Sequence, residues 1–127
     1  MRKILITNNP SVINKFNSVE TIYLEDATLL DVFIYVRDNV HQGARLLTHP
    51  LTSSIKPDET PYKSILISKN EKPYLDFSSL EIISNSIEVV EKFLKGKNKK
   101  NYTSEILKDF QAIDLATITS GIESMGG

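Results

Sequence analysis

The sequence predicts an α/β fold: a small three-layer sandwich with a mainly parallel sheet of about four strands and helices on both faces. Short apolar runs at residues 4–6, 46–47 and 65–67 have the length and composition of buried strands. Residues 29–40 and 83–122 instead repeat apolar side chains at helical spacing, with interruptions. Strands that alternate with helices favour a parallel sheet that is covered on both sides.

The first strand is expected at residues 3–7, where Asn8 and the Asn9–Pro10 pair end the apolar run. Asn9 and Pro10 also favour a helix start, because Asn caps free N–H groups and Pro fits the first turn. A short helix is therefore predicted over residues 11–16. Residues 19–24 contain β-branched and aromatic side chains and predict the second strand.

The middle of the chain begins with a helix that is capped by Asp26 or Thr28. Thr28 and Asp31 have the spacing of a capping box. Gly43 fits the left-handed residue that ends many helices. A strand at residues 45–48 follows, and the next strand is predicted at residues 63–68.

The second long helix is predicted to begin at residues 78–81, whose Ser-Ser-Leu-Glu order is a capping box. Phe77 and Ile82 are placed to form a hydrophobic staple across that start. The helix is expected to reach about residue 94 and to end at Gly96.

The last helix is predicted to start after Thr103, which can cap it. The lysine-rich residues 97–101 before it indicate a solvated connector. Residues 109–114 indicate helix packing with a polar surface, because the apolar residues among them keep helical spacing. Asp114 is expected either to break this helix or to cap it again.

Composition restricts the class of protein. A length of 127 residues predicts a single domain, residues 1–127. The absence of cysteine excludes disulfides, thiolate catalysis and sulfur-ligated metals. A net charge of -1 gives no reason to expect nucleic acid as a partner, and no apolar run reaches the roughly 18 residues of a membrane helix. We therefore expect a cytoplasmic protein that binds neither nucleic acid nor membrane.

A long polar loop at residues 49–61 is the most unusual stretch of the sequence. It contains Pro50, Pro57 and Pro61, which exclude regular structure through most of it. Loops of this length in small domains are often functional. If the strands ending at Thr7 and Thr48 are parallel, their loops emerge at one edge of the sheet, where α/β proteins bind ligands.

Several residues near that edge could carry chemistry. Asn8 and Asn9 lie where a strand meets a helix start, which suits either a capped turn or an anion site. The segment that follows the first strand, residues 8–10, has no glycine, so it lacks a pyrophosphate-binding fingerprint. Arg45 is either a surface residue paired with a carboxylate or a clamp for an anion.

His49 follows a strand and could act as a general base, a ligand holder, a metal ligand or a structural hydrogen-bonding group. Its spacing from His41 matches no recognised metal site. The polar loop has no complete catalytic set, so no catalytic residue, metal or cofactor is predicted. The predicted ligand- or partner-binding residues are Asn8, Asn9, Arg45, Thr48, His49, Ser54, Lys56, Thr60, Tyr62 and Lys63.

Several segments of the sequence resemble the GrdX family, small proteins associated with the glycine reductase system of amino-acid-fermenting anaerobes. They are residues 6–10 (Ile-Thr-Asn-Asn-Pro), residues 45–51 (Arg-Leu-Leu-Thr-His-Pro-Leu) with Ser54 and Lys56-Pro57, residues 60–64 (Thr-Pro-Tyr-Lys-Ser), and Asp109-Phe110-Gln111 with Ile113-Asp114. The resemblance covers nearly the whole chain and is most specific at residues 46–63. It implies an accessory or regulatory protein beside a selenium-dependent, acetyl-phosphate-forming reductase. It implies no catalytic residue and no cofactor, and a chain without cysteine or selenocysteine is not expected to be a redox subunit.

Our first hypothesis is a non-enzymatic accessory protein whose loop at residues 48–63 binds a glycine reductase component or a small anionic metabolite. The alternative is a small enzyme that acts on an acyl or phosphoryl compound. In that enzyme Asn8 and Asn9 would hold the anion, Arg45 and Lys56 would neutralise it, and His49 would move the proton. This alternative requires His49, Arg45 and Asn9 to converge in one pocket. A homodimer is compatible with a domain of this size.

Overall fold

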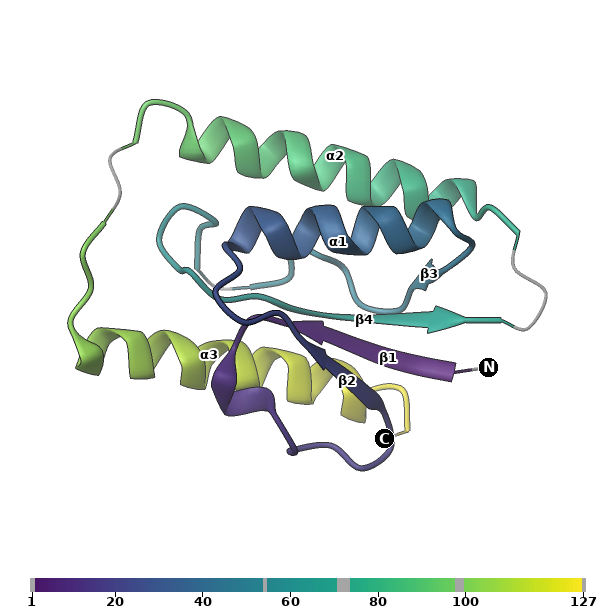
Figure 1. The fold of residues 1–127 in the computed structure, drawn as a ribbon, viewed down its shortest axis with the longest axis horizontal. Coiled ribbons are helices and arrows are strands. Elements are labelled where there is room, and N and C mark those ends of the chain that lie inside the picture. The colour runs from purple at the N-terminus through teal and green to yellow at the C-terminus, as the bar shows by residue number, and fades with distance from the viewer. Residues whose placement is uncertain (1, 54, 71–73, 98–99, 127) are drawn as a thin grey trace.

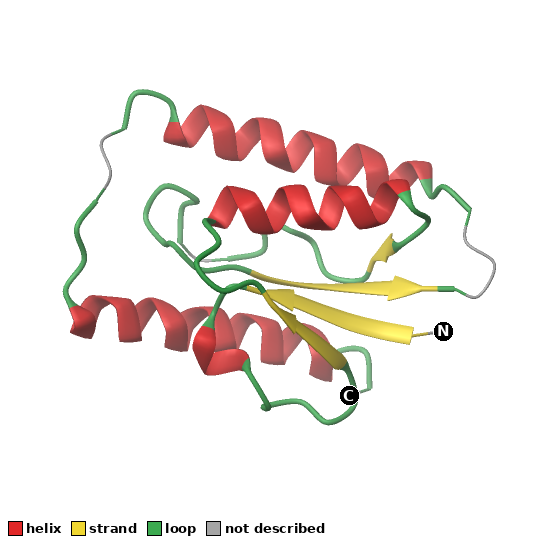
Figure 2. Cartoon of the chain, viewed as in Figure 1, coloured by secondary structure: helices red, strands yellow, loops and turns green. Residues whose placement is uncertain are grey.

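The computed structural model describes residues 2–53, 55–70, 74–97 and 100–126, and it contains a four-stranded mixed sheet (Figures 1 and 2). The strand order is β2-β1-β4-β3. Strand β1 (Arg2–Thr7) pairs in parallel with β2 (Glu20–Tyr23) and antiparallel with β4 (Ser64–Lys69). Strand β3 (Arg45–Leu46) also pairs antiparallel with β4. The predicted α/β class is confirmed, but the prediction of a mainly parallel sheet is wrong.

The direction of β4 explains this difference. Parallel neighbours need a crossover connection, usually a helix, whereas the segment between β3 and β4 has no helix among its described residues. The chain therefore folds back as a wide hairpin. Because β4 runs opposite to both β1 and β3, the carboxyl ends of β1 and β3 lie at the end of the sheet where β4 begins. This end of the sheet is here called the sheet edge.

Helices lie on both faces of the sheet (Figure 1). Helices α1 (Leu29–His41) and α2 (Phe77–Leu94) pack on one face, and α3 (Ser104–Glu123) packs on the other. Alternation along the two central strands supplies both cores, because successive side chains of a strand point to opposite faces. Ile4, Ile6, Ile65 and Ile67 belong to the α1–α2 core, and Leu5 and Leu66 belong to the α3 core.

Three sequence signals for helix ends are confirmed. The Thr28 hydroxyl accepts the N–H of Asp31 at 3.1 Å, and the Asp31 carboxylate accepts the N–H of Thr28 at 3.0 Å, which completes the capping box of α1. Thr103 caps α3. Gly43 follows α1 with a φ of 101°, a conformation that favours glycine.

Other predicted boundaries are wrong. Residues Pro10–Val12 form only one 3-10 turn (η1), although Asn9 caps it as expected. Helix α2 is capped by Asp76, whose carboxylate accepts hydrogen bonds from the N–H and the hydroxyl of Ser79. Phe77 is 74% exposed, so it forms no buried staple. Helix α3 runs through Asp114 without a break.

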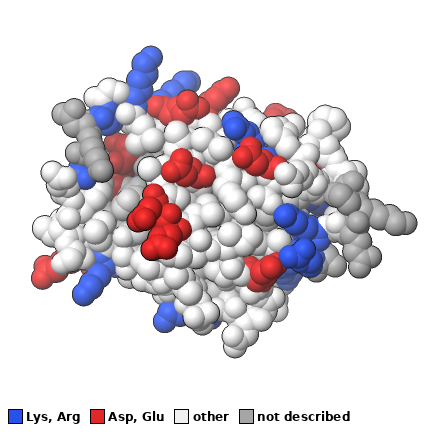
Figure 3. Space-filling model, in the orientation of Figure 1, with Lys and Arg blue, Asp and Glu red and all other residues white. Residues whose placement is uncertain are grey.

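The surface carries both signs of charge. Acidic and basic side chains are interspersed over the face shown in Figure 3. None of the described helices combines the length and the apolar character that a membrane span requires.

Candidate functional site

Asn8 organises the edge of the sheet where β1 ends and β4 begins. Its side-chain carbonyl accepts the N–H of Lys63 at 2.9 Å. Its amide group donates to the carbonyl oxygens of Ala27 and Pro61, at 2.9 and 2.8 Å. The Asn8 side chain therefore joins the start of α1 and the end of the polar loop to the sheet, and both of its N–H donors are used within the protein.

Asn9 joins the same edge to α3. Its side-chain oxygen accepts the N–H of Ser11, and its amide donates to the carbonyl oxygen of Gln111 and to the carboxylate of Asp114. Asp114 is buried and also accepts the N–H and the hydroxyl of Ser64. This carboxylate thus accepts three hydrogen bonds. They join α3 to Asn9, which follows β1, and to Ser64, the first residue of β4.

Polar contacts extend from this edge into the loop. Gln111 donates from its side-chain amide to the Tyr62 hydroxyl at 2.9 Å and accepts a hydrogen bond from the Ser11 hydroxyl. The Thr60 hydroxyl accepts the N–H of Tyr62. Tyr62 and Thr60 are therefore held in place by the protein itself.

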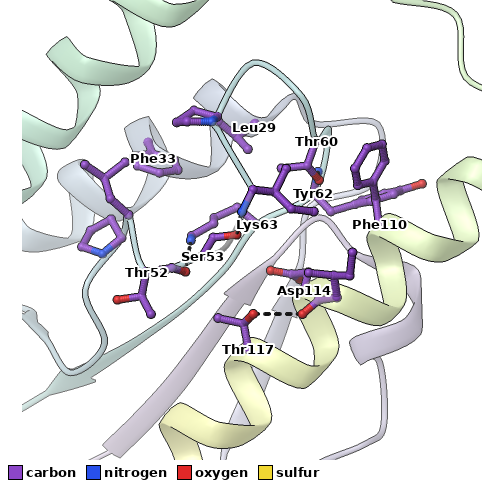
Figure 4. A pocket seen from close by; sticks show the side chains of 15 residues that line it. Leu29, Phe33, Thr52, Ser53, Thr60, Tyr62, Lys63, Phe110, Asp114 and Thr117 are labelled. Carbon is purple, nitrogen blue, oxygen red and sulfur yellow. Dashed lines mark hydrogen bonds between the residues drawn. The ribbon is translucent and has the colours of Figure 1, made fainter.

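Lys63 is the most unusual group at this edge. The residue is only 7% exposed, and its ammonium donates a hydrogen bond to the carbonyl oxygen of Thr52 at 2.9 Å (Figure 4). Burial lowers the pKa of Lys63 to about 8, and the negative charge of Asp114 partly offsets that effect. Within the described part of the chain, no carboxylate lies within 4.0 Å of this ammonium.

A small, partly open space, here called the Lys63 cavity, adjoins this side chain (Figure 4). Its volume is about 30 Å³, enough for a water molecule or two. It lies between the polar loop, the N-terminal half of α1 and the middle of α3. Its lining consists of Leu29, Phe33, Pro50, Leu51, Thr52, Ser53, Ile55, Pro57, Thr60, Tyr62, Lys63, Phe110, Ile113, Asp114 and Thr117.

A wider and more polar space, here called the α3 groove, adjoins the cavity between the loop and the C-terminal half of α3. Its volume is about 630 Å³. Cavity and groove share Thr52, Ser53, Lys63 and Thr117. The remaining groove residues are Leu47, Thr48, His49, Ser64, Ile118, Ser120, Gly121, Ser124 and Met125.

Gly121 sets the distance between α3 and the loop. A Cβ atom on this residue would lie 3.0 Å from Cγ2 of Thr48, closer than most such contacts. Thr48 itself is fixed, because its hydroxyl accepts the N–H of Leu66 at 3.0 Å. The glycine therefore lets the helix approach the loop closely at the bottom of the groove.

The predicted site residues fall into separate groups. Thr48, His49 and Lys63 line the α3 groove together. His49 is exposed, and its Nδ1 accepts the N–H of Leu51 at 3.1 Å, so a neutral imidazole carries its proton on Nε2. Asn8, Asn9, Thr60 and Tyr62 lie near Lys63 but are engaged in the hydrogen bonds described above.

Two predicted residues, Arg45 and Lys56, lie elsewhere. Arg45 pairs with Ser68 toward the other end of β4, and its Nε lies 3.8 Å from the carboxylate of Asp76 at the start of α2. The structure therefore does not bring Arg45 together with His49 and Asn9. Lys56 is exposed in a turn. Ser54 lies outside the described residues.

Sequence reasoning did not identify Ser64, Thr52, Ser53 and Thr117 as site residues, and it gave Asp114 only a place in helix packing. One signal for Asp114 was available. It is spaced by four residues from Phe110 and Ile118, so a carboxylate occupies a position in the apolar stripe of α3. Buried carboxylates need hydrogen-bond partners, and that need predicts a polar contact across the sheet edge.

Metal binding has no support from the geometry. Among the residues that the structure describes, no three His, Asp or Glu side chains are grouped closely enough to hold an ion.

Comparison with known proteins agrees with the resemblance noted in the sequence. The family model described as GrdX-like protein matches residues 4–123, which include the whole lining of the Lys63 cavity and all of the α3 groove lining except Ser124 and Met125. The chain belongs to the GrdX-like family. Membership of this family implies association with the glycine reductase system. No curated protein and no solved structure matched the chain.

Proposed function

We propose that this GrdX-like protein is a non-catalytic accessory or regulatory protein of the glycine reductase system, and that it binds a small anionic metabolite at Lys63 in the cytoplasm. The observation that carries the proposal is the buried Lys63 ammonium. It has a neutral carbonyl as its hydrogen-bond partner and no carboxylate within 4.0 Å in the described part of the chain.

Burying a cation without a close counter-ion destabilises the folded state. A carboxylate or phosphate oxygen that entered from the α3 groove would supply the missing charge. The groove also offers hydroxyl donors to such an anion, from Ser53 and Ser120, whereas the hydroxyls of Thr117 and Ser124 already donate to carbonyl oxygens within α3. Charge and hydrogen bonding therefore favour the same class of ligand.

The enzyme alternative has less support. It assigns anion binding to the amides of Asn8 and Asn9, and both amides already donate two hydrogen bonds within the protein. It also needs Arg45, which is ion-paired with Asp76 at the start of α2. The exposed residues His49, Thr52 and Ser53 at the mouth of the groove offer instead a surface on which a reductase component could sense whether the site is filled.

A thermal-shift screen tests the proposal. The purified protein would be heated with glycine, sarcosine, betaine, acetate, lactate, pyruvate, phosphate and acetyl phosphate. A ligand at 100 times its Kd stabilises a protein by about 2.7 kcal/mol, which is readily measured. We expect at least one anion to raise the Tm of the wild type and of Lys56→Met, an exposed lysine in the same loop, but not of Lys63→Met. An equal shift in Lys63→Met, or no shift with any anion, would contradict the proposal.

A further inference from the structure

We propose that the side-chain amine of Lys63 forms a reversible imine with a small 2-oxo acid, an anion whose carbonyl group adjoins its carboxylate. The inference rests on the proposed anion site and adds a covalent step to it.

The position of the amine is fixed from both ends. The backbone N–H of Lys63 donates to the Asn8 side chain at 2.9 Å, and the Lys63 carbonyl accepts the N–H of Asn8 at 3.4 Å. At the other end, the amine nitrogen is 2.9 Å from the Thr52 carbonyl oxygen. A nucleophile that is held in one place loses little freedom when it reacts.

The surroundings favour the neutral amine. The cavity places apolar side chains such as Phe33 and Leu51 around Lys63, and its nearest polar partner is a carbonyl without charge. With a pKa of about 8, roughly a tenth of the side chains are neutral at pH 7, which is about 300 times the fraction for a lysine with the ordinary value. The neutral form carries the lone pair that attacks a carbonyl carbon.

The reaction needs no cofactor. The amine lone pair attacks the carbonyl carbon of the 2-oxo acid, the C=O electron pair moves to oxygen, and a proton passes from nitrogen to that oxygen. The resulting carbinolamine loses its hydroxyl group as water when a second proton arrives, and a C=N bond forms. The hydroxyl of Ser53, which lines both the cavity and the groove, is placed to relay these protons.

The carboxylate explains why a 2-oxo acid fits better than a simple aldehyde. The ammonium form of Lys63 attracts the carboxylate, and the protonated imine that forms later keeps a positive charge beside it. The charge that is buried in the free protein is therefore paired in the adduct.

Reductive trapping tests this inference. The full-length protein would be incubated with pyruvate or glyoxylate and sodium cyanoborohydride, which reduces protonated imines to stable amines, and the adduct would be mapped by peptide mass spectrometry. We expect Lys63 to be labelled before every other lysine. Lys63→Arg should retain a Tm shift with pyruvate and give no adduct at this position, while Lys56→Met should be labelled like the wild type. Lactate has the same charge but no carbonyl, so it should slow labelling without forming an adduct.

Labelling that spreads over exposed lysines with Lys63 no faster than the rest would overturn the imine. If pyruvate and lactate both raise the Tm through Lys63 in that case, the anion site of the proposed function stands without the covalent step. If neither they nor the other anions shift the Tm, the proposed function fails as well. The wild-type map decides the question even if a Lys63 variant does not fold.

Discussion

The carboxylate of Asp114 accepts hydrogen bonds from both the N–H and the hydroxyl of Ser64, at 3.0 and 2.7 Å. Asp114 lies in the middle of α3, and Ser64 is the first residue of β4 and follows Lys63 directly. The helix that forms one wall of the cavity is therefore hydrogen-bonded to the first residue of β4, which directly follows Lys63.

Replacing Asp114 by Asn should destabilise the fold by about 2–3 kcal/mol. One acceptor oxygen becomes an N–H donor and faces the donors of Ser64 or Asn9, so a buried charge-assisted hydrogen bond is lost. Urea unfolding measures the change. Asp109→Asn, an exposed position on the same helix, is the matched control and should stay within about 0.5 kcal/mol of the wild type. Equal stability of the two variants would show that the hydrogen bonds of Asp114 do not stabilise the fold.

Asn8→Ala should destabilise the fold by about 2–4 kcal/mol, because it leaves the buried N–H of Lys63 and the carbonyl oxygens of Ala27 and Pro61 without their partner. Asn17→Ala, an exposed position in the next loop, provides the comparison. The two would be compared by chemical denaturation at one pH. The account of Asn8 as the organising residue of this edge fails if both variants lose the same small amount.

The buried lysine should make stability depend on alkaline pH. Between about pH 8 and pH 10.5, Lys63 is mostly neutral in the folded chain and protonated in the unfolded chain, so unfolding takes up a proton. The free energy of unfolding should therefore rise with pH across this window, by about 3 kcal/mol in total from this residue. Below pH 8 the buried charge of Lys63 lowers the free energy of unfolding by an amount that does not change with pH.

Subtracting the unfolding free energy of Lys63→Met from that of the wild type isolates this contribution, because other titrating groups cancel. The difference should grow in favour of the wild type from pH 8 to 10.5. A difference that stays constant between pH 8 and 10.5 would contradict the lowered pKa of Lys63.

The close approach of Gly121 and Thr48 predicts a coupled pair of substitutions. Ala has a helix propensity about 1 kcal/mol more favourable than Gly, but in the wild type its Cβ would press on Thr48 Cγ2. Gly121→Ala alone should therefore gain nothing or destabilise. In a Thr48→Ser background, which removes Cγ2 and keeps the hydroxyl, the same change should stabilise by up to about 1 kcal/mol. A double-mutant cycle by thermal or urea unfolding measures the coupling, and additive effects would argue against the contact.

Most elements of the fold could be predicted from local signals. Apolar runs placed β1 and β4, and the Thr28–Asp31 box and Thr103 located the starts of α1 and α3. The start of α2 was misplaced because Asp76 and Ser78 are both capping residues, and the structure uses the carboxylate. Strand direction was also missed, since it depends on how the segment after β3, which has no helix among its described residues, returns to the sheet rather than on any residue within β4.

The site could be predicted only as a region. Residues near positions 8 and 63 were singled out, but the sequence contains no sign that the Asn8 amide spans three backbone groups, nor that Thr52 lies against Lys63. Such contacts join residues far apart in the chain. Pattern reasoning assigns side chains to a face or an edge, and the partner across that edge follows from the tertiary structure.

The pairing of β1 with β4 has a consequence for how the molecule assembles. The bond between Thr7 and Ser64 joins residues 57 apart, and the bond between Asn9 and Asp114 joins residues 105 apart. Chains dominated by such distant contacts fold slowly, because a large loop must close before any contact repays its loss of entropy. During synthesis, the first strand must wait for β4 to leave the ribosome before it gains its central neighbour. Helix α3, which forms one wall of the Lys63 cavity, is synthesised later still, so the proposed anion site can be complete only after α3 has left the ribosome.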